Sequence, residues 1–169
     1  MLDVIFITGC PASGKSTIAK LLQEKLKSPM FEFGWIPEFK LLNIVQSYED
    51  EEKLSFENLN LVVKNYIKHG YSNIIIADIR DDLLTQVPII YKNFSNHIFT
   101  LIPELNDIKS RIQERKVCKN GFANFDLAVK SYNHWIDSKL KYQTKIQTLN
   151  YSPDLIYENI YKYIQLSST

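Results

Sequence analysis

Residues 9–17 read Gly9-Cys10-Pro11-Ala12-Ser13-Gly14-Lys15-Ser16-Thr17, and the first eight of them fit the pattern G-x-x-x-x-G-K-[ST]. The apolar run at 2–8 comes directly before this stretch and is typical of a buried parallel strand. Apolar residues recur after the stretch at helical spacing, at Ile18, Leu21, Leu22 and Leu26. The stretch therefore lies between an expected strand and the helix that it opens, as a phosphate-binding loop must.

Each part of this stretch has a physical role in holding a phosphate. Glycines let the backbone approach the anion closely, because a Cβ would clash there. Consecutive N–H groups and the helix N-terminus supply donors and partial positive charge. We expect residues 9–17 to bind ATP, with Lys15 reaching the β- and γ-phosphates and the Ser16 hydroxyl binding Mg²⁺. A glycine-rich turn without a nucleotide is the alternative, but it does not explain the Lys and Ser after the second glycine.

Composition limits the class of protein. A length of 169 residues predicts one domain, spanning 1–169, and a hydrophobic content of 45% is ordinary for a globular protein. The net charge of +1 argues against a general affinity for nucleic acid, although a local basic site stays open. Cys10 and Cys118 form neither a disulfide framework nor a zinc spacing. With no signal segment or membrane-length apolar run, we expect a cytoplasmic protein without membrane partners, either monomeric or homodimeric.

Strand and helix patterns alternate along the chain, which favours an α/β fold with a parallel sheet and helices on both faces. A helical insert is expected between the second and third strands, with a helix at 39–48, a polar turn at 48–53 and a helix capped by Ser55. Gly70 ends this insert. Asp126 is expected to cap a later helix. Besides 2–8, the expected strands are 30–33, 73–78, 97–102 and 145–150.

Aromatic and acidic residues gather at the end of the second expected strand and just beyond it. Phe33, Trp35 and Phe39 are aromatic, and Glu38 lies among them. In open parallel sheets, ligands bind beyond the carboxyl ends of the strands. We therefore expect these four residues to contact an acceptor substrate. The alternative is that the aromatic side chains pack a helix onto the sheet.

Asp78 ends the third expected strand, and Arg80 follows it two residues later. An apolar strand that ends in Asp is the usual partner of a phosphate loop and places a carboxylate near Mg²⁺. We expect Asp78 to act in metal binding and catalysis, and Arg80 in substrate binding. The alternatives are that Asp78 or Asp82 caps the next helix and that Arg80 is a surface charge.

Arg111 and Arg115 lie four residues apart near the end of an expected helix, so they share one helical face. Arginine binds phosphate oxygens with two parallel hydrogen bonds and is always charged. We expect both arginines to contact the nucleotide, and Arg115 to act in catalysis, from a lid at about 115–126. The alternative is that they complement the negative end of the helix dipole.

These residues together resemble the small P-loop kinases of the adenylate kinase, shikimate kinase and gluconate kinase type. The resemblance covers the whole chain, and its motifs are specific at Gly9–Thr17 and weaker at Asp78 and Arg111–Arg115. It implies a three-layer fold with a five-stranded parallel sheet, a helical acceptor-binding insert at about 35–70 and an arginine-bearing lid. It also implies ATP with Mg²⁺ as donor and transfer of the γ-phosphoryl group to a small acceptor. The D-G-x-P-R string of adenylate kinases and the triple glycine of shikimate kinases are absent from the sequence.

The identity of the acceptor stays open at this point. Glu38 and Glu32 compete for the role of catalytic base, and Asp78 either orients Mg²⁺ or accepts the proton of the acceptor. The aromatic side chains favour a nucleoside, a nucleotide or another ring compound. The rival functions are a nucleic-acid 5′-end kinase, a non-kinase ATPase or nucleotide switch, and a degenerate kinase that binds nucleotide without turnover.

Overall fold

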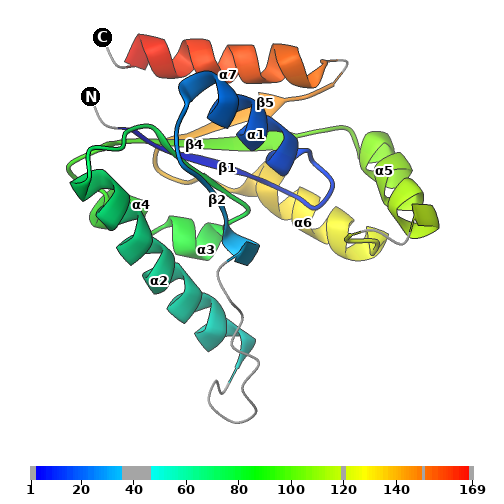
Figure 1. Cartoon of the computed structure of the whole chain (residues 1–169). Helices are drawn as coiled ribbons and strands as arrows, with labels where there is room; N and C mark the ends of the chain where they lie inside the picture. Colours follow the sequence, from blue (N-terminus) through cyan, green and yellow to red (C-terminus); the bar gives the residue numbers. More distant parts are fainter. Residues whose placement is uncertain (1–2, 36–46, 119–120, 150, 168–169) are drawn as a thin grey trace.

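The computed structural model describes residues 3–35, 47–118, 121–149 and 151–167. Their strands form one sheet of five, in the order β2-β3-β1-β4-β5, and each neighbouring pair runs parallel (Figure 1). The expected α/β architecture is therefore confirmed. The strands are β1 (Asp3–Gly9), β2 (Met30–Glu32), β3 (Ile74–Ala77), β4 (Ser95–Ile102) and β5 (Gln143–Gln147).

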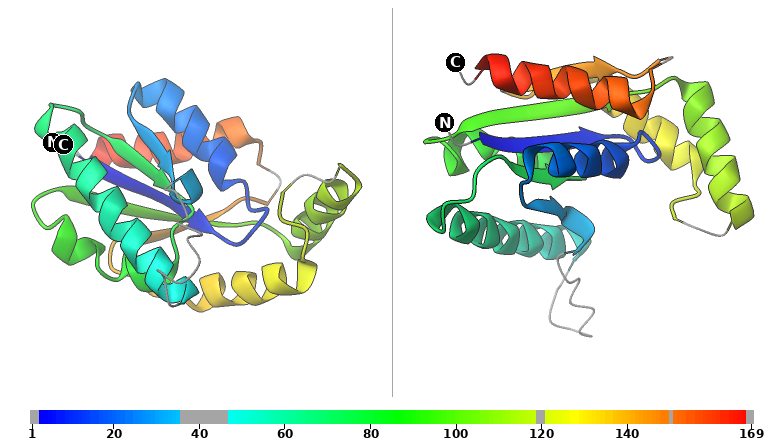
Figure 2. Two further views of the ribbon diagram at one scale, coloured as in Figure 1. Left: turned by 60° about the horizontal axis from the view of Figure 1, so that its bottom comes forward. Right: turned by 45° about the horizontal axis from the view of Figure 1, so that its top comes forward.

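Helices cover both faces of the sheet (Figures 1 and 2). Helices α1 and α7 pack on one face, and α2, α3, α4 and α6 pack on the other. Helix α5 lies at the edge of the sheet where the strands end (Figure 1). The bounds are α1 (Lys15–Leu26), α2 (Tyr48–Lys68), α3 (Asp81–Leu84), α4 (Val87–Ile90), α5 (Leu105–Cys118), α6 (Phe125–Asp137) and α7 (Pro153–Ser167), with a 3₁₀ turn η1 at Phe33–Trp35.

The alternation of side chains along β1 explains this layering. Val4 and Phe6 face the cluster that includes α2 and α6, whereas Ile5 and Ile7 face the cluster that includes α1 and α7. All seven residues of β1 are buried, as expected for a central strand that is covered on both faces. The sheet thereby holds the carboxyl ends of β1 and β3 side by side.

No helix in the described part of the chain combines the length and apolar character of a membrane span.

The start of α2 corrects one expectation. The segment at 48–53 was expected as a polar turn, but it forms the first turns of the helix. Ser47 caps that helix, since its hydroxyl accepts a hydrogen bond from the Asp50 backbone N–H at 3.2 Å. Acidic residues in the first turn suit the positive end of the helix dipole. Ser55, the expected cap, is buried inside the helix. The helix expected at 39–48 lies outside the described residues except at its last two positions.

Other element boundaries also differ from expectation. Helix α6 is capped by Asn124, whose side chain accepts a hydrogen bond from the Leu127 N–H at 3.1 Å, and the expected cap Asp126 lies in the first turn. Strand β5 begins two residues earlier than expected and ends at Gln147. Thr148 therefore follows the strand instead of lying inside it, and this places its side chain at the functional edge of the sheet.

Candidate functional site

The phosphate loop joins β1 to α1, as expected. Gly14 caps α1 with φ of 98°, and no side chain caps the helix there. The first N–H groups of α1 are consequently left for another acceptor, and they carry the positive end of the helix dipole. A helix N-terminus with free N–H groups can bind an anion.

Gly9 is required where β1 turns into the loop. Its φ is +140°, and an added Cβ would lie 2.7 Å from the Leu101 carbonyl oxygen of β4 and 2.9 Å from Ser13 Oγ. Both the backbone conformation and the lack of space exclude a side chain at this position. The loop is thus packed directly against the neighbouring strand, which keeps its backbone in place.

Lys15 lies over the loop and is only 8% exposed. Its Nζ donates hydrogen bonds to the Gly9 and Cys10 carbonyl oxygens at 3.1 and 2.9 Å. The same ammonium lies 3.2 Å from Asp78 Oδ1. The positive charge is therefore held at the mouth of the anion site by groups that a phosphate can replace.

Asp78 reaches this position because β3 is paired with β1. Its backbone N–H donates to the Ile7 carbonyl oxygen at 3.1 Å, one residue beyond the end of β3. Its backbone has φ of 68°, in the left-handed region that non-glycine residues other than Asn and Asp seldom adopt. The side chain is 63% exposed, so the carboxylate keeps access to solvent beside Lys15.

Four expected catalytic or metal-binding residues line one cavity of about 210 Å³. The Ser16 hydroxyl and the Asp78 carboxylate supply oxygen atoms, which are the ligands that Mg²⁺ prefers. Since Mg²⁺ in phosphate sites keeps waters and takes few protein ligands, this pair fits the metal. Within the described residues, no group of three His, Cys, Asp or Glu side chains forms a separate metal cluster. The cavity is lined by Pro11, Ala12, Gly14, Lys15, Ser16, Thr17, Asp78, Arg115 and Phe122.

Helix α5 brings both expected arginines to the loop. Arg111 Nη1 donates to the Ala12 carbonyl oxygen at 3.0 Å. Arg115, one turn further on, lines the 210 Å³ cavity and the two cavities next to it. Ala12 itself has φ of 65°, in the left-handed region that few non-glycine residues adopt. The two arginines thus share a helical face, as expected, and that face is turned to the phosphate loop.

Cys10, in the middle of the loop, is a buried thiol with 1% of its surface exposed. Burial raises the pKa of the Cys10 thiol above its ordinary value, although the charges of Lys15 and Arg111 oppose this shift. The protonated form is a weak nucleophile. Cys10 therefore fills space under the loop and is not a reactive group.

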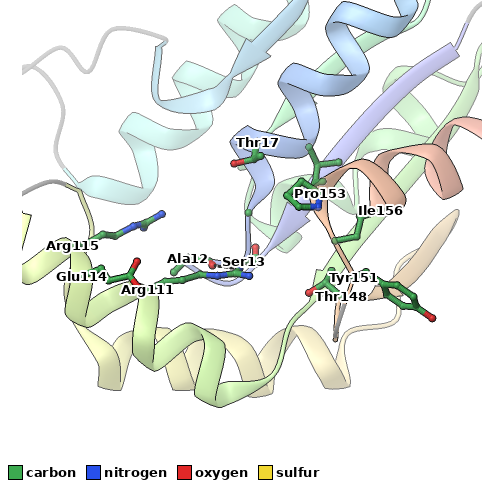
Figure 3. A pocket seen from close by; sticks show the side chains of 12 residues that line it. Ala12, Ser13, Thr17, Arg111, Glu114, Arg115, Thr148, Tyr151, Pro153 and Ile156 are labelled. Carbon is green, nitrogen blue, oxygen red and sulfur yellow. Dashed lines mark hydrogen bonds between the residues drawn. The ribbon is translucent and has the colours of Figure 1, made fainter.

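A second cavity, of about 370 Å³, opens between α5, the phosphate loop and the start of α7 (Figure 3). Figure 3 shows Arg111, Glu114 and Arg115 on one side and Tyr151, Pro153 and Ile156 on the other. Apolar side chains and a planar guanidinium face each other across it, which suits a flat aromatic ring. The lining residues are Ala12, Ser13, Gly14, Thr17, Ile18, Arg111, Glu114, Arg115, Thr148, Tyr151, Pro153 and Ile156.

A third cavity, of about 580 Å³, lies on the other side of Arg115. Ser16 and Arg115 connect it to the phosphate site. Two carboxylates, Glu32 at the end of β2 and Glu114 on α5, lie in its wall. The remaining lining residues are Cys118 and Gly121.

Phe33 and Arg80 are the two expected acceptor-binding residues whose side chains the structure describes, and neither lines these cavities. Phe33 is 8% exposed and belongs to the core cluster under α2, so its aromatic ring packs the sheet. Trp35 ends η1, but its side chain is not described. Glu38 and Phe39 lie outside the described residues.

Arg80 is held by carboxylates on two sides. Its guanidinium binds both oxygens of Asp82 at 3.0 Å and lies 2.9 Å from Glu52 Oε2 of α2. Burial would lower the pKa of Arg80, but Asp82 and Glu52 together raise it. Nearby, His134 Nε2 of α6 lies 2.5 Å from Asp81 Oδ2. These contacts join α2 and α6 to the segment after β3, so Arg80 has a structural role here.

Three lining residues had little or no role in the sequence interpretation. Glu114 lies three residues after Arg111, and this helical spacing was the signal that could have placed it on the same face. Glu32 was named only as a competing base. Thr148 gave no signal, because the strand was expected to continue past it.

Comparison with known proteins agrees with this geometry. A family model described as "AAA domain" matches residues 5–127, which run from within β1 to the start of α6 and contain the whole phosphate loop. Curated proteins gave no match to the sequence.

Solved structures share the fold at low sequence identity. A sugar kinase from Janibacter sp. HTCC2649 matches with a TM-score of 0.70 and 15% identity, over 98% of this chain and 95% of that one. The tunicamycin resistance protein of Deinococcus radiodurans matches with a TM-score of 0.71 and 20% identity, over 97% and 96%. Thymidylate kinase from Candida albicans matches with a TM-score of 0.65 and 14% identity, over 98% and 92%. The expected small P-loop kinase fold is thereby confirmed.

Proposed function

The chain belongs to the AAA domain family, and we propose that it is an ATP-dependent phosphotransferase that moves the γ-phosphoryl group of ATP to a small-molecule acceptor. One observation carries the proposal. Lys15, Ser16, Asp78 and Arg115 come from three separate parts of the chain and line a single cavity at the N-terminus of α1. Phosphoryl transfer depends on positioning and charge stabilisation, and these are the groups that supply both.

Each residue has a distinct task in this mechanism. The backbone N–H groups at the start of α1 bind phosphate oxygens, and Lys15 leaves its carbonyl partners to bind the β- and γ-phosphates. Arg115 stabilises the charge on the group in transfer, because a guanidinium is a cation with a planar pair of donors for phosphate oxygens. Ser16 and Asp78 would hold Mg²⁺, which neutralises phosphate charge when it is bound. Arg111 lies beside the donor.

The donor and the acceptor are proposed to occupy different cavities. The 370 Å³ cavity, with Arg111 opposite Pro153 and Ile156, suits the base of ATP. The 580 Å³ cavity suits the acceptor, because it reaches the phosphate site through Ser16 and Arg115. Glu32 in its wall is a candidate for the base that takes the proton of the acceptor. Glu38, outside the described residues, stays the competing candidate.

We propose an acceptor that is a nucleoside, a nucleotide or another ring-containing metabolite. Two of the solved structures with a similar fold are described as a sugar kinase and a thymidylate kinase. Proteins with this architecture therefore act on acceptors of more than one class. The chain is proposed to act as one domain, with an acceptor-binding insert at about 35–70 and a lid at about 115–126. A cytoplasmic monomer or homodimer without membrane partners accords with this chemistry.

The test is a panel of metabolites and antibiotics assayed for ADP release with ATP and Mg²⁺. We expect one acceptor class to accelerate ADP release in the wild type. Lys15→Ala should abolish this activity, whereas Lys20→Ala, an exposed lysine of the same helix, should retain it. Activity of Lys15→Ala within a few-fold of the wild type would defeat the assignment.

The rival functions give other results in the same assay. A nucleic-acid 5′-end kinase would phosphorylate an oligonucleotide and lose acceptor binding steeply with added salt. An ATPase or nucleotide switch would hydrolyse ATP slowly whatever acceptor is present. A degenerate kinase would bind ATP without releasing ADP.

A further inference from the structure

The whole sequence contains three arginines, which are Arg80, Arg111 and Arg115. Arginine is the side chain best suited to hold a phosphate group, because its planar guanidinium can bind two phosphate oxygens at once. An acceptor that already carries a phosphate would need cations of its own, besides those that hold the donor. The places of the three arginines therefore bear on the class of acceptor.

Two of the arginines lie on α5 beside the phosphate loop. Arg111 Nη1 donates to the Ala12 carbonyl oxygen of the loop at 3.0 Å, and Arg111 lines the 370 Å³ cavity. Arg115 lines the 210 Å³ cavity together with Lys15 and Ser16, where the group in transfer would lie. Both guanidinium groups are thus placed to serve the donor.

The third arginine, Arg80, follows β3 and is already held by other groups. Its guanidinium binds both oxygens of Asp82 at 3.0 Å and lies 2.9 Å from Glu52 Oε2. The two carboxylates offset its charge, and Arg80 lines none of the three cavities. An acceptor phosphate would have to displace both carboxylates to reach it. The chain consequently has no arginine left for a phosphate on the acceptor.

The described wall of the 580 Å³ cavity carries more negative than positive charge. It holds the carboxylates of Glu32, at the end of β2, and Glu114, on α5, against the guanidinium of Arg115. Figure 3 shows Glu114 on α5 between Arg111 and Arg115. Within the described part of the chain, neither carboxylate forms an ion pair that would cancel its charge. A phosphate in this cavity would therefore meet like charge.

The chemistry of the acceptor group leads to the same class. A phosphate monoester carries about two negative charges at neutral pH, so it attacks without giving up a proton. A hydroxyl must lose its proton during transfer, and a carboxylate nearby can take it. Glu32 in the cavity wall would thus assist a hydroxyl acceptor, whereas it would only repel a phosphate acceptor.

We propose that the acceptor carries no phosphate group and receives the γ-phosphoryl group on a hydroxyl, and that Glu114 sets this selectivity by repelling phosphorylated compounds. This inference rests on the proposed function, because it assumes that the 580 Å³ cavity holds the acceptor. It narrows the proposed acceptors to nucleosides and other unphosphorylated ring compounds. A charge that disfavours the wrong substrate is a general route to specificity.

The transfer step balances with groups already described. The hydroxyl oxygen of the acceptor forms a bond to the γ-phosphorus, and the bond between that phosphorus and the bridging oxygen of ADP breaks. ADP leaves with the electron pair of the broken bond. The hydroxyl proton passes to the carboxylate base, for which Glu32 is a candidate.

The experiment measures kcat/KM for ADP release with Mg²⁺–ATP and pairs of acceptors that differ by one phosphate group. The pairs are the common nucleosides with their 5′-monophosphates, and every other active compound of the metabolite and antibiotic panel with its phosphorylated or dephosphorylated partner. Glu114→Gln keeps the size of the side chain and removes its charge. The matched control is Glu158→Gln, the same change at an exposed position of α7 that lines none of the three cavities.

In the wild type, we expect the unphosphorylated member of the active pair to have a kcat/KM at least about a hundredfold higher than that of its phosphorylated partner. Glu114→Gln should lower this ratio by about tenfold, mainly through a gain with the phosphorylated compound, because one like charge is removed. Glu158→Gln should keep the wild-type ratio. The melting temperatures of both variants check that they are folded.

Three results would overturn this inference or its premise. A phosphorylated compound that the wild type uses as well as its unphosphorylated partner would refute the class of acceptor, while the kinase assignment would stand. A ratio that is unchanged in Glu114→Gln, or changed equally in Glu158→Gln, would remove Glu114 from the selectivity. If no compound of either kind accelerates ADP release, the proposed function itself fails, and this result is distinct from the other two.

Discussion

Lys15 and Asp78 form an ion pair across the phosphate loop, with 3.2 Å between Nζ and Oδ1. The two residues are 63 positions apart in the sequence, and they meet because β3 pairs with β1 in parallel register. In this state Lys15 is held by Asp78 and two carbonyl oxygens, in place of phosphate oxygens. The donor must therefore draw Lys15 away from these partners when it binds.

The carboxylate of Asp78 is expected to matter for turnover more than for folding. Asp78→Asn keeps a side chain that tolerates φ of 68° but removes the negative charge. We expect kcat to fall by about a hundredfold and the Mg²⁺ concentration for half-maximal activity to rise. Steady-state ADP release over a Mg²⁺ titration measures both. Asp137→Asn, at the exposed end of α6, is the control, and wild-type kinetics in Asp78→Asn would contradict the role.

The close contact between the phosphate loop and β4 predicts a stability effect at Gly9. Gly9→Ala places a Cβ 2.7 Å from the Leu101 carbonyl oxygen at an unfavourable φ. We expect a loss of about 1–3 kcal/mol in the free energy of unfolding. Gly34→Ala, where an added Cβ meets nothing within 4 Å, should change it by less than about 0.5 kcal/mol. Urea unfolding followed by circular dichroism compares the two, and equal stabilities would refute the packing argument.

Arg115 is expected to act on the group in transfer. Arg115→Ala should lower kcat by about a thousandfold, since a positioned arginine in phosphoryl transfer contributes on this scale. Arg115→Lys should recover only part of the loss, because an ammonium lacks the planar pair of donors. Single-turnover ADP formation at saturating ATP separates this effect from binding. Lys109→Ala, on the same helix, serves as the control. A kcat for Arg115→Ala close to that of Lys109→Ala would remove Arg115 from the mechanism.

The two thiols should differ sharply in reactivity. Cys118 is exposed at the end of α5, whereas Cys10 is buried and its pKa is raised by that burial. Since a raised pKa keeps the thiol protonated, an increase in pH from 7 to 8 should leave Cys10 inert. Mass spectrometry after iodoacetamide treatment at pH 8 should find label on Cys118 alone, and on both cysteines in guanidinium chloride. Rapid native labelling of Cys10 would show that the loop opens more than the structure implies.

Local patterns in the sequence were sufficient for the phosphate loop and the sheet. The motif at 9–17 carries its own chemistry, and apolar runs identify strands that are buried on both faces. The helix spacing of Arg111 and Arg115 likewise placed them on one face. These features depend on residues that are close in sequence, so single-sequence reasoning reaches them.

The acceptor side depends on contacts that no local pattern reports. Phe33 was expected at the acceptor because it lies at the carboxyl end of the second expected strand, but its side chain is buried in the core cluster that includes α2. Arg80 was expected at the substrate, but Glu52 of α2 pairs with it across a long stretch of chain. Thr148 was missed because the expected strand ran past it. The sequence of β5 is only weakly apolar, so its pattern does not show where the strand ends. Helix caps were misplaced for a related reason, since Ser, Asn and Asp compete for that position with similar energies.

The central claim is that the loop at 9–17 binds a nucleoside triphosphate through Lys15. Calorimetric titration of Mg²⁺–ATP into the wild-type protein and into Lys15→Ala tests it most directly. We predict saturable binding at one site per chain in the wild type, and an affinity at least about tenfold weaker in Lys15→Ala, whose melting temperature should stay close to that of the wild type. The absence of saturable heat in the wild type, or equal affinities in the two proteins, would contradict the account.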